Sequence, residues 1–261
     1  MKICVLASGS SGNCIYAGTA SAHILIDAGL SGRETLNRLA QAGVRLAEIM
    51  AVCLTHEHSD HIAGLGVLHT RHGIALYANA GTIEAVGKDE KLRGLPWHVF
   101  STGAVFPIGD LNLEPFSVSH DAYEPVGFVL AAGPVRVGVV TDIGVTTHLV
   151  RERLKHCRAL VIESNHDERL LADARRPWPL KQRIAGRQGH LSNQHAAELI
   201  AEIAGNDLHQ VFLFHLSLDC NRPELALKPT CEALRCRGLA HVQVSLTYAN
   251  QISAIWATGP E

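Results

Sequence analysis

The chain has 261 residues, of which 47% are hydrophobic, so it is long enough to bury a large core as one domain or as two halves. Its net charge of −2 and isoelectric point near 6.8 exclude a general electrostatic attraction to nucleic acid or to a membrane surface. Any contact with a polyanion must therefore come from a local basic patch.

The cysteines and apolar segments set expectations for location. The seven cysteines include no Cys-x-x-Cys pair, which is typical of reduced thiols that pack as small hydrophobic side chains. Residues 1–7 are apolar too briefly for a signal peptide, and no stretch reaches the roughly 18 apolar residues of a membrane span. We expect a cytoplasmic protein without a membrane partner, and the sequence leaves its oligomeric state open.

The chain begins with three short apolar runs that predict buried strands, at residues 3–7, 14–17 and 23–26. The small residues 8–13 predict a hairpin turn, because they lack the lysine of a phosphate-binding loop. We expect Asp27, which follows the third run, to orient a metal-ligating histidine, with a turn cap as the alternative. A helix is predicted over residues 31–43, where Ser31 and Glu34 form a capping signature.

The most informative stretch is Thr55–His61, which follows the apolar run 49–54. If that run is a strand, the extended chain leaving it places His56, His58 and Asp60 on one face, and His61 joins them if a helix begins there. Imidazole nitrogens and carboxylate oxygens are the usual ligands of zinc and similar divalent ions. This pattern predicts a metal site.

The next predicted elements are a helix at residues 62–72, a strand at 74–77, a helix at 81–86, and strands at 99–106 and 111–119 around a turn at 107–110. His69 and His72, in the first of these helices, are expected to be core or surface residues, because ligands are already supplied by the preceding motif.

Five predicted strands end in a chemically capable residue. The residues at the carboxyl ends of these runs are, in chain order, His56, His120, Asp142, Glu163 and His215. Ligands gather at the carboxyl edge of sheets that are flanked by helices. The agreement of five strands predicts a single functional site at that edge.

The order His56-x-His58-x-Asp60-His61, His120, Asp142, His215 resembles the ligand set of the metallo-β-lactamase superfamily. Within it, the chain is similar to the YycJ (WalJ-like) metallohydrolases. The blocks that carry this closer resemblance are 7–13, 26–31, 55–61, 119–122, 163–167, 189–193 and 215–217. The resemblance implies an α/β fold, an αβ/βα four-layer sandwich, with residues 1–261 as one hydrolase domain of two similar halves.

The same resemblance implies two divalent metal ions, for which zinc, manganese and iron fit the ligand types. It assigns one ion to His56, His58 and His120, and the second to Asp60, His61 and His215, with Asp142 bridging. One departure is Cys220, which stands where relatives tend to have the first of two asparagines. We expect its thiol to be a bystander.

The implied activity is that of a nuclease, an exonuclease on DNA in bacterial members, which attacks with a hydroxide activated by the metal ions. By the resemblance, His190 donates a proton to the leaving oxygen and Glu163 positions it, with a structural hydrogen bond as the alternative. We count Asp60 with these two as catalytic. Asn165 and His166 are expected to contact substrate or to close the turn after Glu163, and Asn221 is a further expected substrate contact.

Residues 175–187 form a local basic stretch with five basic residues, one tryptophan and no acidic residue. We expect Arg175, Arg176, Lys181 and Arg183 to bind phosphates, and Trp178 is suited to stack on an unpaired base. The alternative is ordinary solvated surface.

Two other functions fit the sequence. One is a small-molecule hydrolase of the same fold, acting on a thioester, lactone or cyclic phosphate. The other is a metal-dependent regulator without turnover, against which the complete ligand set argues. A nuclease requires an open, positive groove, whereas a small-molecule hydrolase requires a closed pocket.

Overall fold

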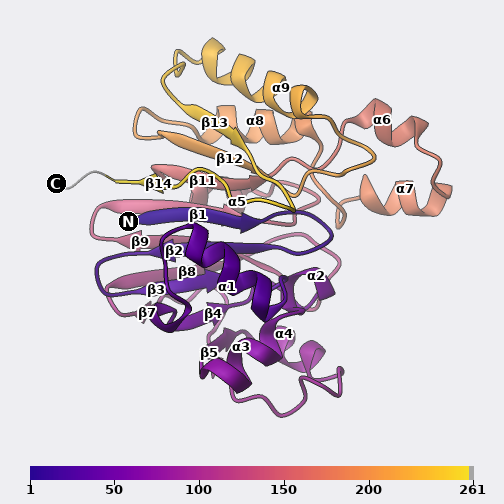
Figure 1. The fold of residues 1–261 in the computed structure, drawn as a ribbon. Coiled ribbons are helices and arrows are strands. Elements are labelled where there is room, and N and C mark those ends of the chain that lie inside the picture. Colours follow the sequence, from indigo (N-terminus) through magenta and orange to yellow (C-terminus); the bar gives the residue numbers. More distant parts are fainter. Residues whose placement is uncertain (259–261) are drawn as a thin grey trace.

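The computed structural model describes residues 1–258, which form two seven-stranded mixed sheets packed face to face, with helices on both outer surfaces (Figure 1). In spatial order, the first sheet contains β14 (Trp256–Ala257), β1 (Lys2–Ala7), β2 (Cys14–Gly18), β3 (His23–Ile26), β4 (Ala51–Cys53), β5 (Ala75–Ala78) and β6 (His98–Val99). The second contains β13 (Gln243–Leu246), β12 (Gln210–Phe214), β11 (Ala159–Glu163), β10 (Val135–Val140), β9 (Val126–Ala132), β8 (Leu111–Ser117) and β7 (Phe106–Ile108).

The two sheets have the same pairing pattern. Counted from β14, the first sheet has three antiparallel pairings followed by three parallel ones. Counted from β7, the second sheet repeats this order. The predicted αβ/βα sandwich of two similar halves is confirmed.

Helices cover the outer face of each sheet (Figure 1). On the first sheet lie α1 (Gly32–Gln41), α3 (Leu65–His72) and α4 (Ala80–Val86), and on the second α5 (His148–Leu154), α8 (Asn193–Ile203) and α9 (Pro223–Cys236). Other helical segments are the 3-10 turn Leu46–Glu48, α6 (Glu168–Asp173) and α7 (Trp178–Ile184). Among the described residues, no helix combines the length and apolarity needed to cross a membrane.

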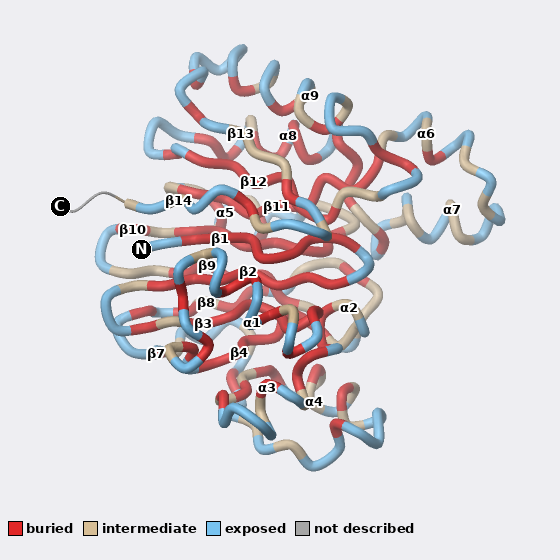
Figure 2. The backbone as a smooth tube through the Cα atoms, viewed as in Figure 1, coloured by how far each residue is buried: buried red, intermediate tan, exposed pale blue. Residues whose placement is uncertain are grey.

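The core has three apolar layers, one between the sheets and one under each set of helices. Strands such as β2, β11 and β12 are buried along their whole length, because both faces of each sheet are covered. Figure 2 shows this pattern, with buried strands inside and exposed helix surfaces outside.

The functional edge follows from strand direction. Strands β10, β11 and β12 pair in parallel, and β8 points the same way because two antiparallel pairings separate it from β10. Their carboxyl ends therefore meet at one edge, beyond which α6 and α7 extend (Figure 1).

Two local predictions were wrong. Residues 99–106 are not one strand: β6 belongs to the first sheet and β7 to the second, and the segment between them, which contains Gly103 at φ +90°, crosses from sheet to sheet. The helix predicted over residues 62–72 begins later, as α3, and of that range only Ile62 belongs to the preceding helix, α2 (Ser59–Ile62). The break between the two helices falls at Gly64, whose amide donates to Ala28 O at 2.8 Å.

Replacing Gly64 with alanine should destabilise the fold. A Cβ at this position would lie 2.0 Å from Leu30 O, so the backbone would have to move. We expect a loss of about 1–3 kcal/mol in unfolding free energy, the usual cost of overpacking, measured by urea denaturation.

Gly205→Ala is the matched control, because nothing lies within 4 Å of its Cβ position. Its unfolding free energy should change by less than about 1 kcal/mol. Equal stability of the two variants would contradict the close backbone approach at Gly64.

Candidate metal centre

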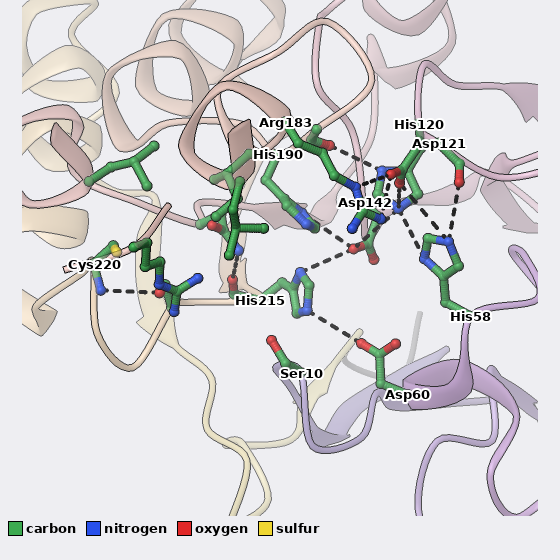
Figure 3. A pocket seen from close by; sticks show the side chains of 17 residues that line it. Ser10, His58, Asp60, His120, Asp121, Asp142, Arg183, His190, His215 and Cys220 are labelled. Atoms are coloured by element: carbon green, nitrogen blue, oxygen red, sulfur yellow. Dashed lines mark hydrogen bonds and ion pairs between the residues drawn. The ribbon is translucent and has the colours of Figure 1, made fainter. Parts of the chain in front are cut away.

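Seven histidine and aspartate side chains converge at the carboxyl edge of the two sheets, and those that line the cavity, among them Asp60, Asp142 and His215, are drawn in Figure 3. The first sheet supplies four of them in the segment after β4: His56, His58, Asp60 and His61. The second sheet supplies His120 after β8, Asp142 after β10 and His215 after β12. The convergence that the strand endings predicted is thus present.

Three imidazoles form the first group of donors. One ring nitrogen from each of His56, His58 and His120 lies within 4.8 Å of the others. His120 Nε2 is 3.3 Å from His58 Nδ1, and His56 Nε2 is buried without a hydrogen-bond partner. Three neutral imidazoles at this spacing fit one divalent ion.

The second group contains two imidazoles and two carboxylates. His61 Nε2 lies 3.2 Å from Asp142 Oδ2 and 3.6 Å from Asp60 Oδ2. His215 approaches the same carboxylates, with Nε2 3.6 Å from Asp60 Oδ2 and Nδ1 3.1 Å from Asp142 Oδ1. Asp142 also belongs to a cluster with His56, so its carboxylate lies between the two groups.

Unsatisfied polar atoms in the cluster are a second observation, independent of the sequence motif, that supports metal binding. His56 Nε2, Asp142 Oδ2 and His215 Nε2 are buried polar atoms that lack any hydrogen-bond partner. Such atoms are costly unless something else satisfies them. They all belong to the cluster, which is therefore compatible with divalent metal binding.

Hydrogen bonds from outside the cluster orient three of its imidazoles. Nδ1 of His120 lies 3.1 Å from Gly189 O, and Nδ1 of His56 lies 2.9 Å from Thr55 Oγ1. Nδ1 of His61 lies 2.8 Å from the carboxylate of Asp27. With Nδ1 engaged in this way, Nε2 of each of these rings faces the other members of the cluster, where a metal ion could bind it.

The carboxylate of Asp27 therefore lies beside His61, the contact that an orienting role requires. Asp27 is buried, and its carboxylate accepts further bonds from Thr55 N and Thr55 Oγ1, both at 2.8 Å. Asn13 was not foreseen: its Nδ2 lies 2.9 Å from Asp60 Oδ2 and 2.9 Å from His61 Nε2. This contact depends on the tertiary structure, because the β1–β2 hairpin brings residue 13 next to α2.

The electrostatics of the cluster reflect burial and close opposite charges. Burial alone would raise the pKa of Asp142, but the charges of His215 and His61 hold it well below its usual range. Burial opposes protonation of His61, yet Asp27 and Asp142 raise its pKa to about 10. His56 faces other imidazoles, and burial together with His61 lowers its pKa well below the ordinary value.

His190 and Glu163 form the pair that the sequence suggested. His190 Nδ1 lies 2.6 Å from Glu163 Oε1. The same oxygen is 3.1 Å from His215 Nδ1, and Oε2 accepts from the backbone amides of Ile143 and Leu191. Glu163 thus fixes both rings from beneath, while His190 lines the cavity (Figure 3).

The residues of the basic stretch, which covers the loop after α6, helix α7 and the turn that follows it, lie in different places. Arg176 and Arg183 line the cavity of about 250 Å³ above the cluster, whereas Arg175 and Lys181 do not. Arg183 pairs with Asp121, and Arg176 Nη2 lies 2.7 Å from Asp219 Oδ2. Lys181 donates to the backbone oxygen of Ala172, and Trp178 is 67% exposed. The sequence did not single out Asp121 or Asp219 as partners of the arginines.

The other expected contacts occupy different places. Asn165 lines the cavity, and its Nδ2 donates to His215 O at 2.8 Å. His166 is buried outside the lining, and the Asn221 amide nitrogen donates to the backbone oxygens of Ser164 and Asn165, both at 2.9 Å. Cys220 is buried and lines the cavity as well.

Residues 22–216 match the family model of the β-lactamase superfamily domain. The chain belongs to the metallo-β-lactamase superfamily. Two relatives share 38% identity with it: exodeoxyribonuclease YycJ of Bacillus anthracis, over 90% of this chain and 89% of the relative, and exodeoxyribonuclease WalJ of Streptococcus pneumoniae, over 86% and 85%. The crystal structure of the metallo-β-lactamase fold protein YhfI from Bacillus subtilis has a TM-score of 0.73 at 15% identity, covering 98% of this chain and 99% of YhfI.

The outer hydrogen bonds of this metallo-β-lactamase site generate a prediction at Asp27. In Asp27→Asn, the side-chain amide would donate to His61 Nδ1, so that His61 Nε2 would carry the proton and could not bind a metal ion. We expect metal affinity to fall by about 10–100-fold, measured on metal-stripped protein by competition with a chromophoric chelator.

Asp207→Asn, an exposed change in the turn before β12, at the end of that strand opposite His215, should leave the affinity unaltered and serves as the control. Wild-type affinity in Asp27→Asn would show that Asp27 does not govern the orientation of His61.

Proposed function

We propose that this protein is an exonuclease that hydrolyses phosphodiester bonds in DNA with divalent metal ions, and that residues 1–261 form one hydrolase domain. The observation that carries the proposal is a buried histidine and aspartate cluster beneath a cavity lined by two arginines. Metal donors and phosphate-binding side chains in one cavity fit phosphodiester hydrolysis. The relatives at 38% identity, both named exodeoxyribonucleases, support the choice of DNA.

We assign one ion to His56, His58 and His120, a second to Asp60, His61 and His215, and a bridging position to Asp142. Zinc, manganese and iron suit these nitrogen and oxygen donors. When bound, such ions lower the pKa of water and neutralise charge on the phosphodiester. Asp60, held by Asn13, keeps a low pKa because His215 and His61 outweigh the effect of burial, so its carboxylate is ionised and ready to bind a cation.

The residues that line the cavity are suited to bind the end of a DNA strand. Arg176 and Arg183 are placed to bind phosphates in exchange for Asp219 and Asp121. Leu171 of α6 and Leu180 and Ile184 of α7 also line the cavity, where they form an apolar wall that offers a surface to a base. A wall at this point favours removal of terminal nucleotides over cleavage within a long duplex.

His190 is assigned as the proton donor to the leaving oxygen, and Glu163 as its positioning residue. Burial would lower the pKa of His190, but the Glu163 carboxylate 2.6 Å away raises it above the ordinary value. A raised pKa keeps a proton available near neutral pH, as a general acid requires.

The free state of all seven cysteines, five of them buried, supports a reducing compartment, and we place the protein in the cytoplasm.

The function is tested by incubating end-labelled single-stranded and double-stranded DNA and RNA with the protein in a series of divalent metals. We expect stepwise shortening of DNA from one end, which a chelator abolishes.

Asp142→Ala should lose metal and activity together, because its carboxylate serves both ions. The small cavity makes a small-molecule hydrolase the second candidate, and turnover of thioesters or cyclic phosphates without any cleavage of DNA would favour it.

The proton donor is tested with two substrates at full metal occupancy. His190→Ala should slow cleavage of a substrate with a poor leaving group by roughly 10²–10⁴-fold, because protonation of that group is lost. A nitrophenyl phosphodiester needs little protonation and should be affected far less. In His120→Ala both rates should fall together, because a metal ligand is removed.

If both substrates slow equally in His190→Ala, the residue positions other groups, and the acid must be another residue that lines the cavity, which His166 does not.

A further inference from the structure

A second cavity of about 660 Å³ adjoins the metal-centre cavity of about 250 Å³. The two share Ser10, Arg176 and Ser217 in their linings. The second cavity is bounded by the turn between β1 and β2, by the segment that follows His215, and by residues 247–249. We call it the side groove.

The walls of the side groove are fixed to the metal centre by hydrogen bonds. The amide of Ser8 donates to Tyr248 O at 3.1 Å, and the Ser8 hydroxyl accepts from the amide of His215 at 2.7 Å. Arg38 Nη2 donates to Ala249 O at 3.1 Å. A preformed groove of this kind binds with little cost of ordering.

The lining combines the two kinds of surface that a nucleic acid strand needs. Arg222 is exposed there and Arg176 lies at the junction with the metal-centre cavity, so cationic side chains are available for phosphates. Tyr248 is 38% exposed and Leu218 is 86% exposed, which offers aromatic and apolar surface to bases.

The path of a bound DNA strand depends on which side of the metal-centre cavity is walled and which side opens. A polymer with one phosphodiester at the metal centre must continue away from it. Helices α6 and α7 wall one side, through Leu171, Leu180 and Ile184, whereas the side groove opens directly from the cavity at Ser10 and Ser217. We propose that the side groove holds the uncleaved part of a single DNA strand, with Arg222 on its backbone and Tyr248 stacked on a base. This proposal rests on the nuclease function proposed above.

Asp219 sets the charge at the entrance to the side groove. Its carboxylate lies 2.7 Å from Arg176 Nη2, at the place where the two cavities meet, and is itself 70% exposed. A strand that passes this point must displace the carboxylate from Arg176. Removal of that negative charge should therefore favour binding, opposite in sign to the loss of Arg222.

The experiment compares kcat/KM for a dinucleotide and for a single strand of about 12 nucleotides, within the site sizes known for single-strand-binding grooves. For wild-type protein the longer substrate should be preferred. Tyr248→Ala should reduce that preference about fivefold or more, since stacking on one aromatic side chain contributes at least this factor. Arg222→Ala should also reduce it about fivefold or more, because a contact with a phosphate is lost. The dinucleotide rate should stay at the wild-type value, which also shows that the metal centre is intact.

Three matched variants sharpen the comparison. Tyr248→Phe retains the ring and should keep the preference for the long strand. Arg237→Ala removes an exposed arginine at the opposite end of α9 from Arg222 and should change nothing. Asp219→Asn should increase the preference.

An equal kcat/KM for both lengths in wild-type protein, or an unchanged preference in Tyr248→Ala and Arg222→Ala, would refute the side-groove proposal and leave the nuclease standing. A reduction in Arg237→Ala equal to that in Arg222→Ala would also refute it, because surface charge alone would then explain the effect. Failure of wild-type protein to cleave either DNA under any metal would refute both proposals.

Discussion

The contact of Asp142 with His61 and His215 joins the two halves of the molecule. Asp142 and His215 follow strands of the second sheet, whereas His61 follows β4 of the first sheet. Asp142 Oδ2 lies 3.2 Å from His61 Nε2 and Oδ1 lies 3.1 Å from His215 Nδ1, and all three side chains are buried. Removal of one partner from such a buried group leaves an uncompensated charge, at a cost of about 3–5 kcal/mol. The chemistry of the centre and the packing of the two sheets therefore constrain each other.

This constraint reaches the backbone. Among the described residues, three that are not glycine have positive φ, and two of them, Asp27 at 63° and His215 at 58°, lie at the site. This conformation is unfavourable for a residue with a side chain and persists only where the surroundings enforce it. The amide of Asp27 donates to Cys53 O at 3.0 Å, and that of His215 donates to Ser8 Oγ. Local strain is thus retained where it turns a carboxylate or an imidazole toward the cluster.

Residues at the ends of buried strands could be predicted from sequence because two simple rules coincide there. A continuous apolar run identifies a strand in a covered sheet, and the polar residue that follows lies at its edge. His56, Asp142, Glu163 and His215 follow from this reasoning. To predict that these residues lie together at one edge, only the direction of the strands is needed, and the fold class gives that direction.

Contacts between segments that are far apart in the sequence could not be predicted in this way. Asn13 reaches Asp60 only because the β1–β2 hairpin ends beside α2, and no local pattern encodes that approach. The division of the basic stretch has the same cause: which arginines of α7 and of the loop before it face the cavity depends on how this segment packs across the edge. The segment 99–106 was misread because its apolar residues belong to two different sheets.

The charges of the centre also link metal binding to substrate binding. The cavity lining contains three aspartates, Asp60, Asp121 and Asp142, against two arginines, and both arginines are already paired with carboxylates. Divalent cations would add positive charge beside these three carboxylates. A chain with net charge −2 has no general attraction to DNA, so the positive charge that attracts a strand must come from the site itself. We therefore expect occupancy of the metal sites to govern the binding of the strand as well as its cleavage.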